Sequence, residues 1–213
     1  MFKDREDAGK RLAERLLKYE GANATVLALP RGGVIVGAEV ARALALPLDI
    51  VVPRKVGYPG NPEYAVCATD AEGTLVCNER ETADIDKGWL KKEIEKEQEE
   101  ARRRIRLYRV DKDPLDIRNK IAIIVDDGVA TGLTMRLAVM AVKKQHPQKI
   151  IVAVPVAPFE AVRALREDAE VIVLEPPEDF LGAVGAHYGY FPQVEDAEVM
   201  ALQQQKTAVQ FKQ

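Results

Sequence analysis

The sequence predicts an α/β fold in which a mostly parallel, twisted sheet is flanked by helices. Two observations predict it: strand patterns alternate with helical patterns, and several strands are continuous apolar runs, such as 121–125. A strand buried on both faces has no polar side, so such runs are typical of a parallel sheet covered by helices on both faces. In sheets of this kind, ligands bind beyond the carboxyl ends of the strands.

The first half of the chain contains two strand-then-helix patterns and a hairpin pattern. Ala8, Leu12 and Leu16 recur at helical spacing between charged residues, and Pro30 ends the first apolar strand. The segment 53–62 holds three prolines and two glycines, which predicts an irregular, mobile loop. The expected elements are a helix over 4–19, a strand over 25–29, a helix over 33–44, a strand over 48–52 and a hairpin that pairs 65–68 with 74–76.

The second half begins with a long charged helix, expected over 87–109, whose apolar positions form one narrow stripe. Five arginines lie between Arg102 and Arg109, near the helix C-terminus, where cations suit the macrodipole. This pattern favours a solvated face, and a contact with phosphate or with a partner is the alternative. The remaining expected elements are strands over 121–125, 150–155 and 171–174, helices over 133–145 and 159–167, and a short helix from 196.

Length and charge limit the architecture and the class of function. The 213 residues are expected to form one domain over 1–213, with a core over 23–175 and a hood over 175–192, to which 1–20 can contribute. The net charge of −3 excludes a global positive field that would hold nucleic acid or an anionic membrane. The chain has no apolar run of about 20 residues and does not start like a signal peptide, so we expect a cytoplasmic protein.

The two cysteines are too few for a disulfide framework or a zinc site. Cys67 and Cys77 can face each other across the hairpin, and two buried, reduced thiols are the favoured interpretation because the cytosol keeps such pairs reduced. His146 and His187 are far apart in the sequence, so a metal held by protein nitrogen and sulfur is not expected. We expect any metal to bind together with a small-molecule ligand that carries it.

The sharpest motif is the apolar strand 121–125 followed by Asp126, Asp127 and a turn of small residues that opens a helix. Such a turn presents backbone N–H groups at a helix N-terminus and forms a phosphate cradle. Two adjacent carboxylates do not suit phosphate; they suit sugar hydroxyls, a developing positive charge or Mg²⁺. A ribose phosphate satisfies both needs. The alternative is a structural turn whose aspartates cap the helix.

Two further motifs follow strand ends nearer the start of the chain. Arg31, Gly32 and Gly33 come after the first strand; glycines let the backbone approach an anion closely, and the arginine offers a fork of donors. Arg54 and Lys55 begin the breaker-rich segment after the second strand, and a mobile loop there would exclude water from a bound ligand. An ordinary tight turn and an ordinary surface loop are the respective alternatives.

The three motifs, in this order and spacing, resemble those of type I phosphoribosyltransferases, and the likeness covers roughly residues 23–175. The chain is similar to stand-alone microbial phosphoribosyltransferases of about this length, which end in a segment like 183–191. The resemblance implies transfer of ribose 5-phosphate from phosphoribosyl pyrophosphate (PRPP) to a nitrogenous base or amine, with Mg²⁺ as cofactor and pyrophosphate as product. It also implies a homodimer. Neither a membrane nor, given the charge, nucleic acid is an expected partner.

The resemblance also implies a role for each motif residue. Asp126 and Asp127 would be the catalytic residues that hold the ribose and stabilise its positive ring, and they are the protein groups that can approach the Mg²⁺ carried by PRPP. The 5-phosphate would bind to Gly128, Val129, Ala130, Thr131, Gly132 and Thr134. The pyrophosphate would bind to Arg31, Gly32, Gly33, Arg54 and Lys55.

The identity of the acceptor stays open. Aromatic residues in 175–192 can stack on a planar base, although a small aromatic core is the favoured interpretation. A packed His187 is likewise favoured over one that exchanges protons with the base. Leu133 stands where many family members carry a small residue, and we expect it to be buried without disturbing the cradle. The helix over 87–109 is absent from the purine and orotate enzymes, so its role is open.

Three alternatives to the enzyme remain. A non-catalytic PRPP sensor or regulator would keep the fold and the phosphate sites. A dinucleotide-binding module would need a G-x-G-x-x-G motif after a strand, which this sequence lacks. A metal phosphohydrolase would use Asp126 and Asp127 to release phosphate without PRPP.

Overall fold

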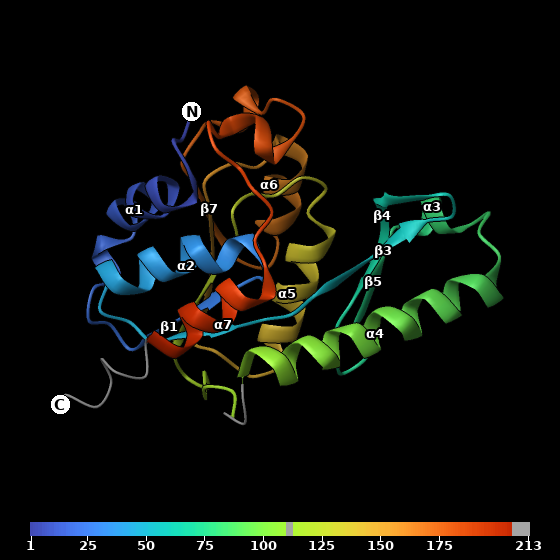
Figure 1. Ribbon diagram of the computed structural model, residues 1–213, viewed down its shortest axis with the longest axis horizontal. Helices are drawn as coiled ribbons and strands as arrows, with labels where there is room; N and C mark the ends of the chain where they lie inside the picture. Colours follow the sequence, from blue (N-terminus) through green and yellow to red (C-terminus); the bar gives the residue numbers. More distant parts are fainter. Residues whose placement is uncertain (110–112, 206–213) are drawn as a thin grey trace.

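The computed structural model describes residues 1–109 and 113–205 and contains a five-stranded parallel sheet with helices on both faces, beside a three-stranded antiparallel sheet (Figure 1). The large sheet has the order β2-β1-β6-β7-β8. Its strands are β1 (Ala24–Ala28), β2 (Leu48–Ile50), β6 (Ile121–Val125), β7 (Lys149–Val154) and β8 (Glu170–Val173). The predicted fold class, a parallel sheet flanked by helices, is confirmed.

Helices form where the apolar spacing predicts them, within a few residues at each end. The two faces of the large sheet are covered by α1 (Arg5–Arg15), α2 (Gly32–Ala43) and α7 (Asp196–Gln205) on one side, and by α5 (Leu133–Lys143) and α6 (Phe159–Leu165) on the other. Short 3₁₀ turns occupy Leu17–Tyr19, Pro177–Asp179 and Val184–His187.

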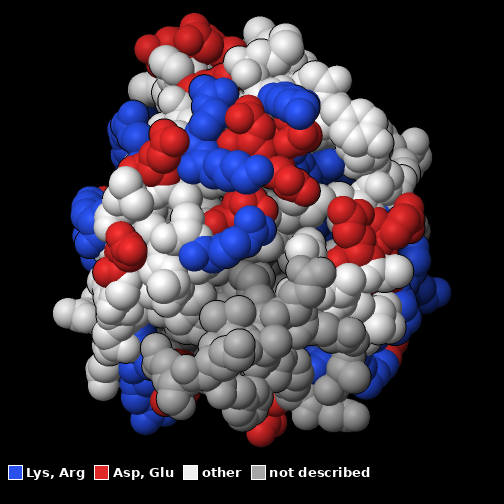
Figure 2. Space-filling view, turned by 60° about the vertical axis from the view of Figure 1, so that its left-hand side comes forward, with Lys and Arg blue, Asp and Glu red and all other residues white. Residues whose placement is uncertain are grey.

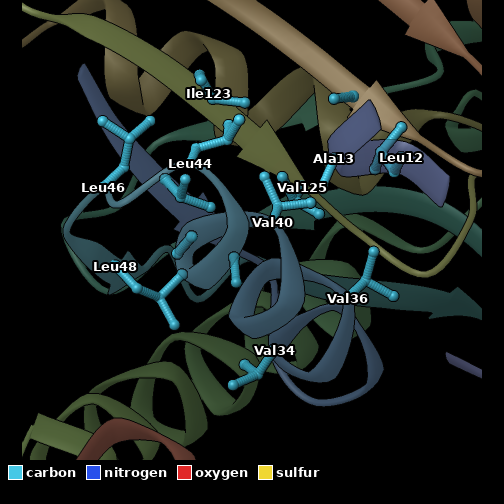
Figure 3. Close-up of a cluster of buried hydrophobic side chains, with 14 of the residues drawn as sticks. Leu12, Ala13, Val34, Val36, Val40, Leu44, Leu46, Leu48, Ile123 and Val125 are labelled. Atoms are coloured by element: carbon cyan, nitrogen blue, oxygen red, sulfur yellow. The ribbon is translucent and has the colours of Figure 1, made fainter. Parts of the chain in front are cut away.

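Alternating side chains of the strands supply two separate cores. In β1, Val26 packs into the cluster under α1 and α2, whereas Leu27 packs into the cluster under α5 and α6. This follows from the period of two residues along a strand, which sends neighbouring side chains to opposite faces. Figure 3 shows the first cluster, where Leu12 of α1, Val40 of α2 and Val125 of β6 come together. The central strands are therefore buried on both faces and hold their carboxyl ends rigidly.

The small sheet extends to one side of the large one together with α4 (Figure 1). It contains β3 (Arg54–Tyr58), β4 (Asn61–Thr69) and β5 (Leu75–Cys77), and it is followed by α3 (Glu79–Thr82) and α4 (Lys87–Arg109). The expectation of an irregular loop over 53–62 is wrong, because this segment forms the β3–β4 hairpin. Its breakers occupy the turn, where Gly60 has φ +80°, and the irregular pairing on either side of Gly57.

The hairpin predicted between 65–68 and 74–76 is confirmed as the β4–β5 pair. Cys67 and Cys77 are directly opposite in its register, with their Cα atoms 4.0 Å apart, and they form a disulfide. The expectation of two reduced thiols is therefore wrong in this structure. The cause is the register itself, which places both sulfur atoms on the same face at paired positions.

The long helix α4 is confirmed with the predicted bounds, and it holds the small sheet through polar contacts. The Glu97 carboxylate accepts a hydrogen bond from the guanidinium of Arg54 in β3 at 2.7 Å. The Gln98 side chain donates a hydrogen bond to the Thr69 hydroxyl at 3.2 Å. Arg102 donates to the carbonyl of Ala71 at 3.1 Å. One side of the helix thus packs on the hairpins. The expectation of a solvated arginine face holds only in part: Arg103 and Arg106 are exposed, whereas Arg109 is partly buried and lies 3.3 Å from a carboxylate oxygen of Asp49.

The segment 175–192 packs against the start of the chain. Phe2 forms a parallel β-bridge with Tyr188 and shares a small buried cluster with Tyr188 and Val156. The amino group of Met1 lies 2.7 Å from a carboxylate oxygen of Glu175. Residues 175–192 are called the hood segment below. They lie near the carboxyl ends of the strands of the large sheet.

Charges of both signs are interspersed on the face shown in Figure 2, with Lys and Arg next to Asp and Glu. Such a face gives no broad field of one sign for a polyanion to bind. Within the part of the chain that the structure describes, no helix is long and apolar enough to cross a bilayer.

Candidate active site

Two of the predicted motifs meet at the carboxyl ends of the neighbouring strands β1 and β6. Asp126 and Asp127 follow β6, and Gly32 and Gly33 open α2 after β1. A Cβ built on Gly32 would come within 1.9 Å of Asp127 Oδ2, and one on Gly33 within 2.7 Å of Asp126 Oδ1. Each glycine thus leaves room for one carboxylate, so the two motifs form a single site.

The two carboxyl groups have different surroundings. The Asp126 side chain accepts the backbone N–H of Asp127 at 2.8 Å, and the Tyr188 hydroxyl donates to the carbonyl of Asp127 at 2.5 Å. Burial raises the pKa of Asp126, and the nearby charge of Asp127 raises it further. Burial also raises the pKa of Asp127, but the guanidinium of Arg5 opposes this shift.

Arg5, in the first turn of α1, is a site residue that the sequence analysis missed. Its Nε donates to Asp127 Oδ2 at 2.7 Å, and its side chain is only 8% exposed. Its guanidinium also donates to the carbonyl of Pro192 at 2.7 Å and lies 3.7 Å from the centroid of the Phe191 ring. The one signal in the sequence is weak: a cation in the first turn of a helix opposes the macrodipole.

The turn after the acid pair leads into the N-terminus of α5. Gly132 has φ +83°, a conformation that suits glycine, and no side chain of the described residues caps the helix there. Ala130 and Thr131 are exposed and Thr134 is half-buried, whereas Val129 is buried and its N–H donates to Val156 at 2.9 Å. The turn therefore presents the uncapped first-turn N–H groups of α5 beside exposed small residues, as a phosphate cradle requires.

Gly128 and Leu133 fix this turn against the rest of the fold. A Cβ on Gly128 would come within 2.4 Å of Val184 in the hood segment. Leu133 is buried, as expected, and packs with Ala68 and Val76 of the small sheet. The small sheet and the hood segment thus both contact the turn.

Arg31, just before α2, contacts the start of α7. Its Nη1 lies 3.7 Å from a carboxylate oxygen of Glu195 and 3.8 Å from one of Asp196. Asp196 also accepts the Tyr108 hydroxyl at 2.5 Å and lies 3.5 Å from Arg103 of α4. The Tyr108 hydrogen bond holds the pKa of Asp196 below its usual value despite partial burial. The arginine predicted for pyrophosphate therefore has carboxylate partners within the chain.

With this geometry established, the comparisons with known proteins identify the family. The family model described as "Phosphoribosyl transferase domain" matches residues 2–190. This chain belongs to the phosphoribosyltransferase family.

Individual relatives agree with this assignment. Two Mycobacterium tuberculosis proteins, each named "Putative phosphoribosyl transferase" (MT0597 and Rv0571c), are 39% identical over 205 residues, which is 95% of this chain. The alignment covers 46% of each relative, so this chain spans about half the length of the curated proteins it matches. The crystal structure of TT1426 from Thermus thermophilus is 42% identical, with 96% of this chain and 98% of that chain covered and a TM-score of 0.79.

In this phosphoribosyltransferase domain, Arg54 and Lys55 lie in β3 of the small sheet. Arg54 pairs with Glu97 of α4, and both residues have limited exposure. Lys55 is half-buried and lies opposite Ala68 in the register. The structure thus brings together Arg31, Gly32, Gly33 and the acid pair, while it holds Arg54 on α4.

His187 is a packed residue of the hood segment. Its Nε2 accepts the N–H of Leu181 at 3.0 Å, so the neutral ring carries its proton on Nδ1, which lies 2.5 Å from Glu175. Although burial raises the pKa of Glu175, hydrogen bonds from the Met1 amino group and His187 hold it below its usual value. Both ring nitrogens are occupied, which agrees with the favoured interpretation of a structural histidine.

The aromatic residues of the hood segment form a small core, as favoured above. Phe180 stacks on His187, and Phe191 lies 4.8 Å from Tyr188, measured between ring centroids. Tyr190 is 67% exposed and is the large aromatic side chain of this segment that a ligand could reach.

A cavity of about 370 Å³ lies between the turn 128–134 and the small sheet. Its lining consists of Tyr64, Ala65, Cys77, Asn78, Glu79, Thr131, Leu133 and Arg136. The lining is mainly polar, and Thr131 connects it to the turn. This volume is within the range of sites for small molecules.

The acid pair provides a donor set that suits Mg²⁺ only in part. Among the described residues, no group of three or more His, Cys, Asp or Glu side chains is arranged to hold a metal ion. Mg²⁺ is commonly bound by one or two carboxylates together with oxygens of the substrate's phosphates. Asp126 and Asp127 fit that pattern when a phosphorylated substrate supplies the other oxygens.

Proposed function

We propose that this chain transfers ribose 5-phosphate from PRPP to a nitrogenous acceptor and releases pyrophosphate. The observation that carries the proposal is the packing of the acid pair, Asp126 and Asp127, directly on Gly32 and Gly33 at the end of neighbouring strands. The phosphate turn follows the same acids in the chain. One ligand with a phosphate, a sugar and a pyrophosphate matches these three parts in order.

The 5-phosphate binds at the turn 128–134. The uncapped N-terminus of α5 and the exposed Thr131 supply donors, and the helix dipole favours the negative charge. Gly132 adopts the positive φ of this turn without steric cost, because glycine has no Cβ atom.

The acid pair acts on the sugar. The bond between C1 and the pyrophosphate oxygen breaks and its electron pair leaves with pyrophosphate, while the acceptor nitrogen forms a bond to C1 with its lone pair and gives up its proton to solvent or to the pyrophosphate. Positive charge develops on the ring as the first bond lengthens ahead of the second, and the carboxylates of Asp126 and Asp127 stabilise it while their oxygens accept hydrogen bonds from the ribose hydroxyls. No covalent bond to the protein is needed.

The pyrophosphate binds beside α2. Gly32 and Gly33 allow the backbone to approach it, and Arg31 supplies donors once it leaves Glu195 and Asp196. Arg54 and Lys55 join this subsite only if the β3–β4 hairpin moves toward it. When bound, Mg²⁺ neutralises the charge that develops on the leaving pyrophosphate.

The acceptor enters from the side of the hood segment or of the cavity at Thr131. The polar lining of that cavity, with Asn78 and Arg136, favours an acceptor with several hydrogen-bonding groups.

The chain acts as a homodimer in the cytoplasm. Sedimentation at several protein concentrations measures whether the chain forms a dimer.

The test is Mg²⁺- and PRPP-dependent release of pyrophosphate, measured across a panel of nucleobases and other amines. Release with at least one acceptor supports the enzyme. If PRPP binds in calorimetry and no acceptor gives release, the non-catalytic PRPP sensor is supported instead. If inorganic phosphate is released in the absence of PRPP, the protein is a phosphohydrolase. Failure to bind PRPP contradicts both the transferase and the PRPP sensor.

A further inference from the structure

Arg5 forms a direct ion pair with one acid of the candidate site. It reaches Asp127 from α1, which lies outside the three motifs. The two residues are 122 positions apart in the chain, and the side chains of both are at least 85% buried. An ion pair of this kind is not a surface contact, and it needs its own explanation.

The local charges supply one. Two adjacent carboxylates at the end of β6 must lie near a ligand that carries a 5-phosphate and a pyrophosphate, and like charges repel strongly where water is excluded. Arg5 forms its ion pair with Asp127. Its charge also acts on Asp126, where it opposes the rise in pKa that burial and the neighbouring Asp127 cause.

We propose that Arg5 is a positioning residue, which cancels the charge of Asp127 and holds its carboxylate on Gly32, so that the acid pair can lie beside an anionic sugar phosphate. This inference rests on the proposed function. Arg5 acts through Asp127 and does not itself touch the reacting atoms. Its contacts with Pro192 and Phe191 link the same carboxylate to the hood segment.

A purely structural role is the competing explanation, because Arg5 also ties α1 to the hood segment. A double-mutant cycle separates the two roles. We measure binding of PRPP with Mg²⁺, and of ribose 5-phosphate alone, by calorimetry for the wild type, Arg5→Gln, Asp127→Asn and the double variant.

If Arg5 acts by cancelling charge, Arg5→Gln weakens binding by about tenfold or more in the wild-type background. In the Asp127→Asn background, the same change weakens binding by less than about threefold, because removing both partners leaves no uncompensated charge. An equal loss in both backgrounds overturns the inference, since the contacts to Pro192 and Phe191 are lost in both.

Two further variants keep the test readable if Asp127→Asn alone abolishes binding. Arg5→Lys retains the charge and loses the planar fork, so it should keep binding within about fivefold of the wild type. Phe191→Leu removes the ring below the guanidinium and leaves the ion pair in place, so it should change binding by less than about threefold. A loss in both variants as large as that of Arg5→Gln supports the structural role and contradicts our inference.

Arg11→Gln is the matched control. Arg11 lies in the same helix, its guanidinium is 4.4 Å from the centroid of the Phe2 ring, and it lies 3.8 Å from Asp7. This change should leave binding unaltered. If the wild type itself binds neither PRPP nor ribose 5-phosphate, the proposed function fails, a result distinct from every outcome of the cycle.

Discussion

Gly32 and Asp127 are in direct contact, so closely that a Cβ at position 32 would lie 1.9 Å from the carboxylate oxygen Oδ2. The carboxylate of Asp127 therefore occupies the space that a side chain at position 32 would need. This packing requires glycine here whether or not an anion binds near the loop.

Gly32→Ala should accordingly disturb the acid pair before any ligand binds. We expect it to lower the free energy of unfolding by about 1–3 kcal/mol, as overpacking does, although alanine is otherwise the better helix former. We also expect PRPP binding to weaken by at least about tenfold. Urea unfolding and calorimetry measure both effects. Gly88→Ala in α4 is the control, since its nearest neighbour is an Asp86 oxygen at 3.3 Å; equal losses in both variants would contradict this account.

Asp126→Asn should leave the fold intact and reduce pyrophosphate release by about 10²-fold or more, as expected for a preorganised electrostatic group. Asp127→Asn should reduce it in the same direction. Initial rates at saturating PRPP measure the effect, and Asp168→Asn, which alters an exposed pair with Lys143, should not change them. Wild-type rates in either site variant would reject the assignment of the acids.

Asp196→Asn should make Arg31 more available to a bound anion. The amide still accepts the Tyr108 hydroxyl, so α7 should stay in place while one of the two carboxylates near Arg31 loses its charge. Since partly exposed pairs are weak, we expect inorganic pyrophosphate to bind about two- to fivefold more tightly. Calorimetry measures this, with Glu198→Gln in the same helix as the control. Unchanged or weaker binding would show that Asp196 does not compete for Arg31.

Glu175 should make the stability of the protein depend on acidity. Its pKa in the folded chain lies below its usual value because the Met1 amino group and His187 donate to it, in opposition to burial. The stabilisation is therefore present above the ordinary pKa of a glutamate and is lost as the pH falls through the lowered value.

The variant Glu175→Gln tests this. At neutral pH it should unfold about 2 kcal/mol more easily than the wild type, the usual value of a hydrogen bond to a charged group. The difference should shrink toward zero as the pH falls below about 4. Urea unfolding at several pH values gives the curve, and Glu178→Gln, in the same segment, should show no such convergence. A difference that is constant with pH would contradict the role of the charge.

The sequence was sufficient to predict the large sheet, the bounds of β6 and the burial of Leu133, because these depend on local patterns. The apolar run 121–125, set among alternating strand and helix patterns, favours a strand buried on both faces, and the acids that follow it then lie at the edge of the sheet. The roles of the motif residues remain predictions.

What the sequence could not reveal depends on contacts between distant segments. Arg5 reads as an ordinary charged residue of an amphipathic helix, and only the packing of α1 on α2 brings it to Asp127. The same holds for Arg54, whose partner Glu97 lies 43 positions away. The β3–β4 hairpin was missed because its prolines and glycines indicate a break, while the structure uses them for a turn and irregular pairing.

The bond between Cys67 and Cys77 gives the protein two chemical forms. Because Cys77 borders the cavity that Thr131 also lines, breaking this bond would alter the wall of that cavity as well as the covalent link between β4 and β5. A sample with this bond and a sample without it would be different molecules at the cavity, so the redox state should be recorded in every acceptor screen.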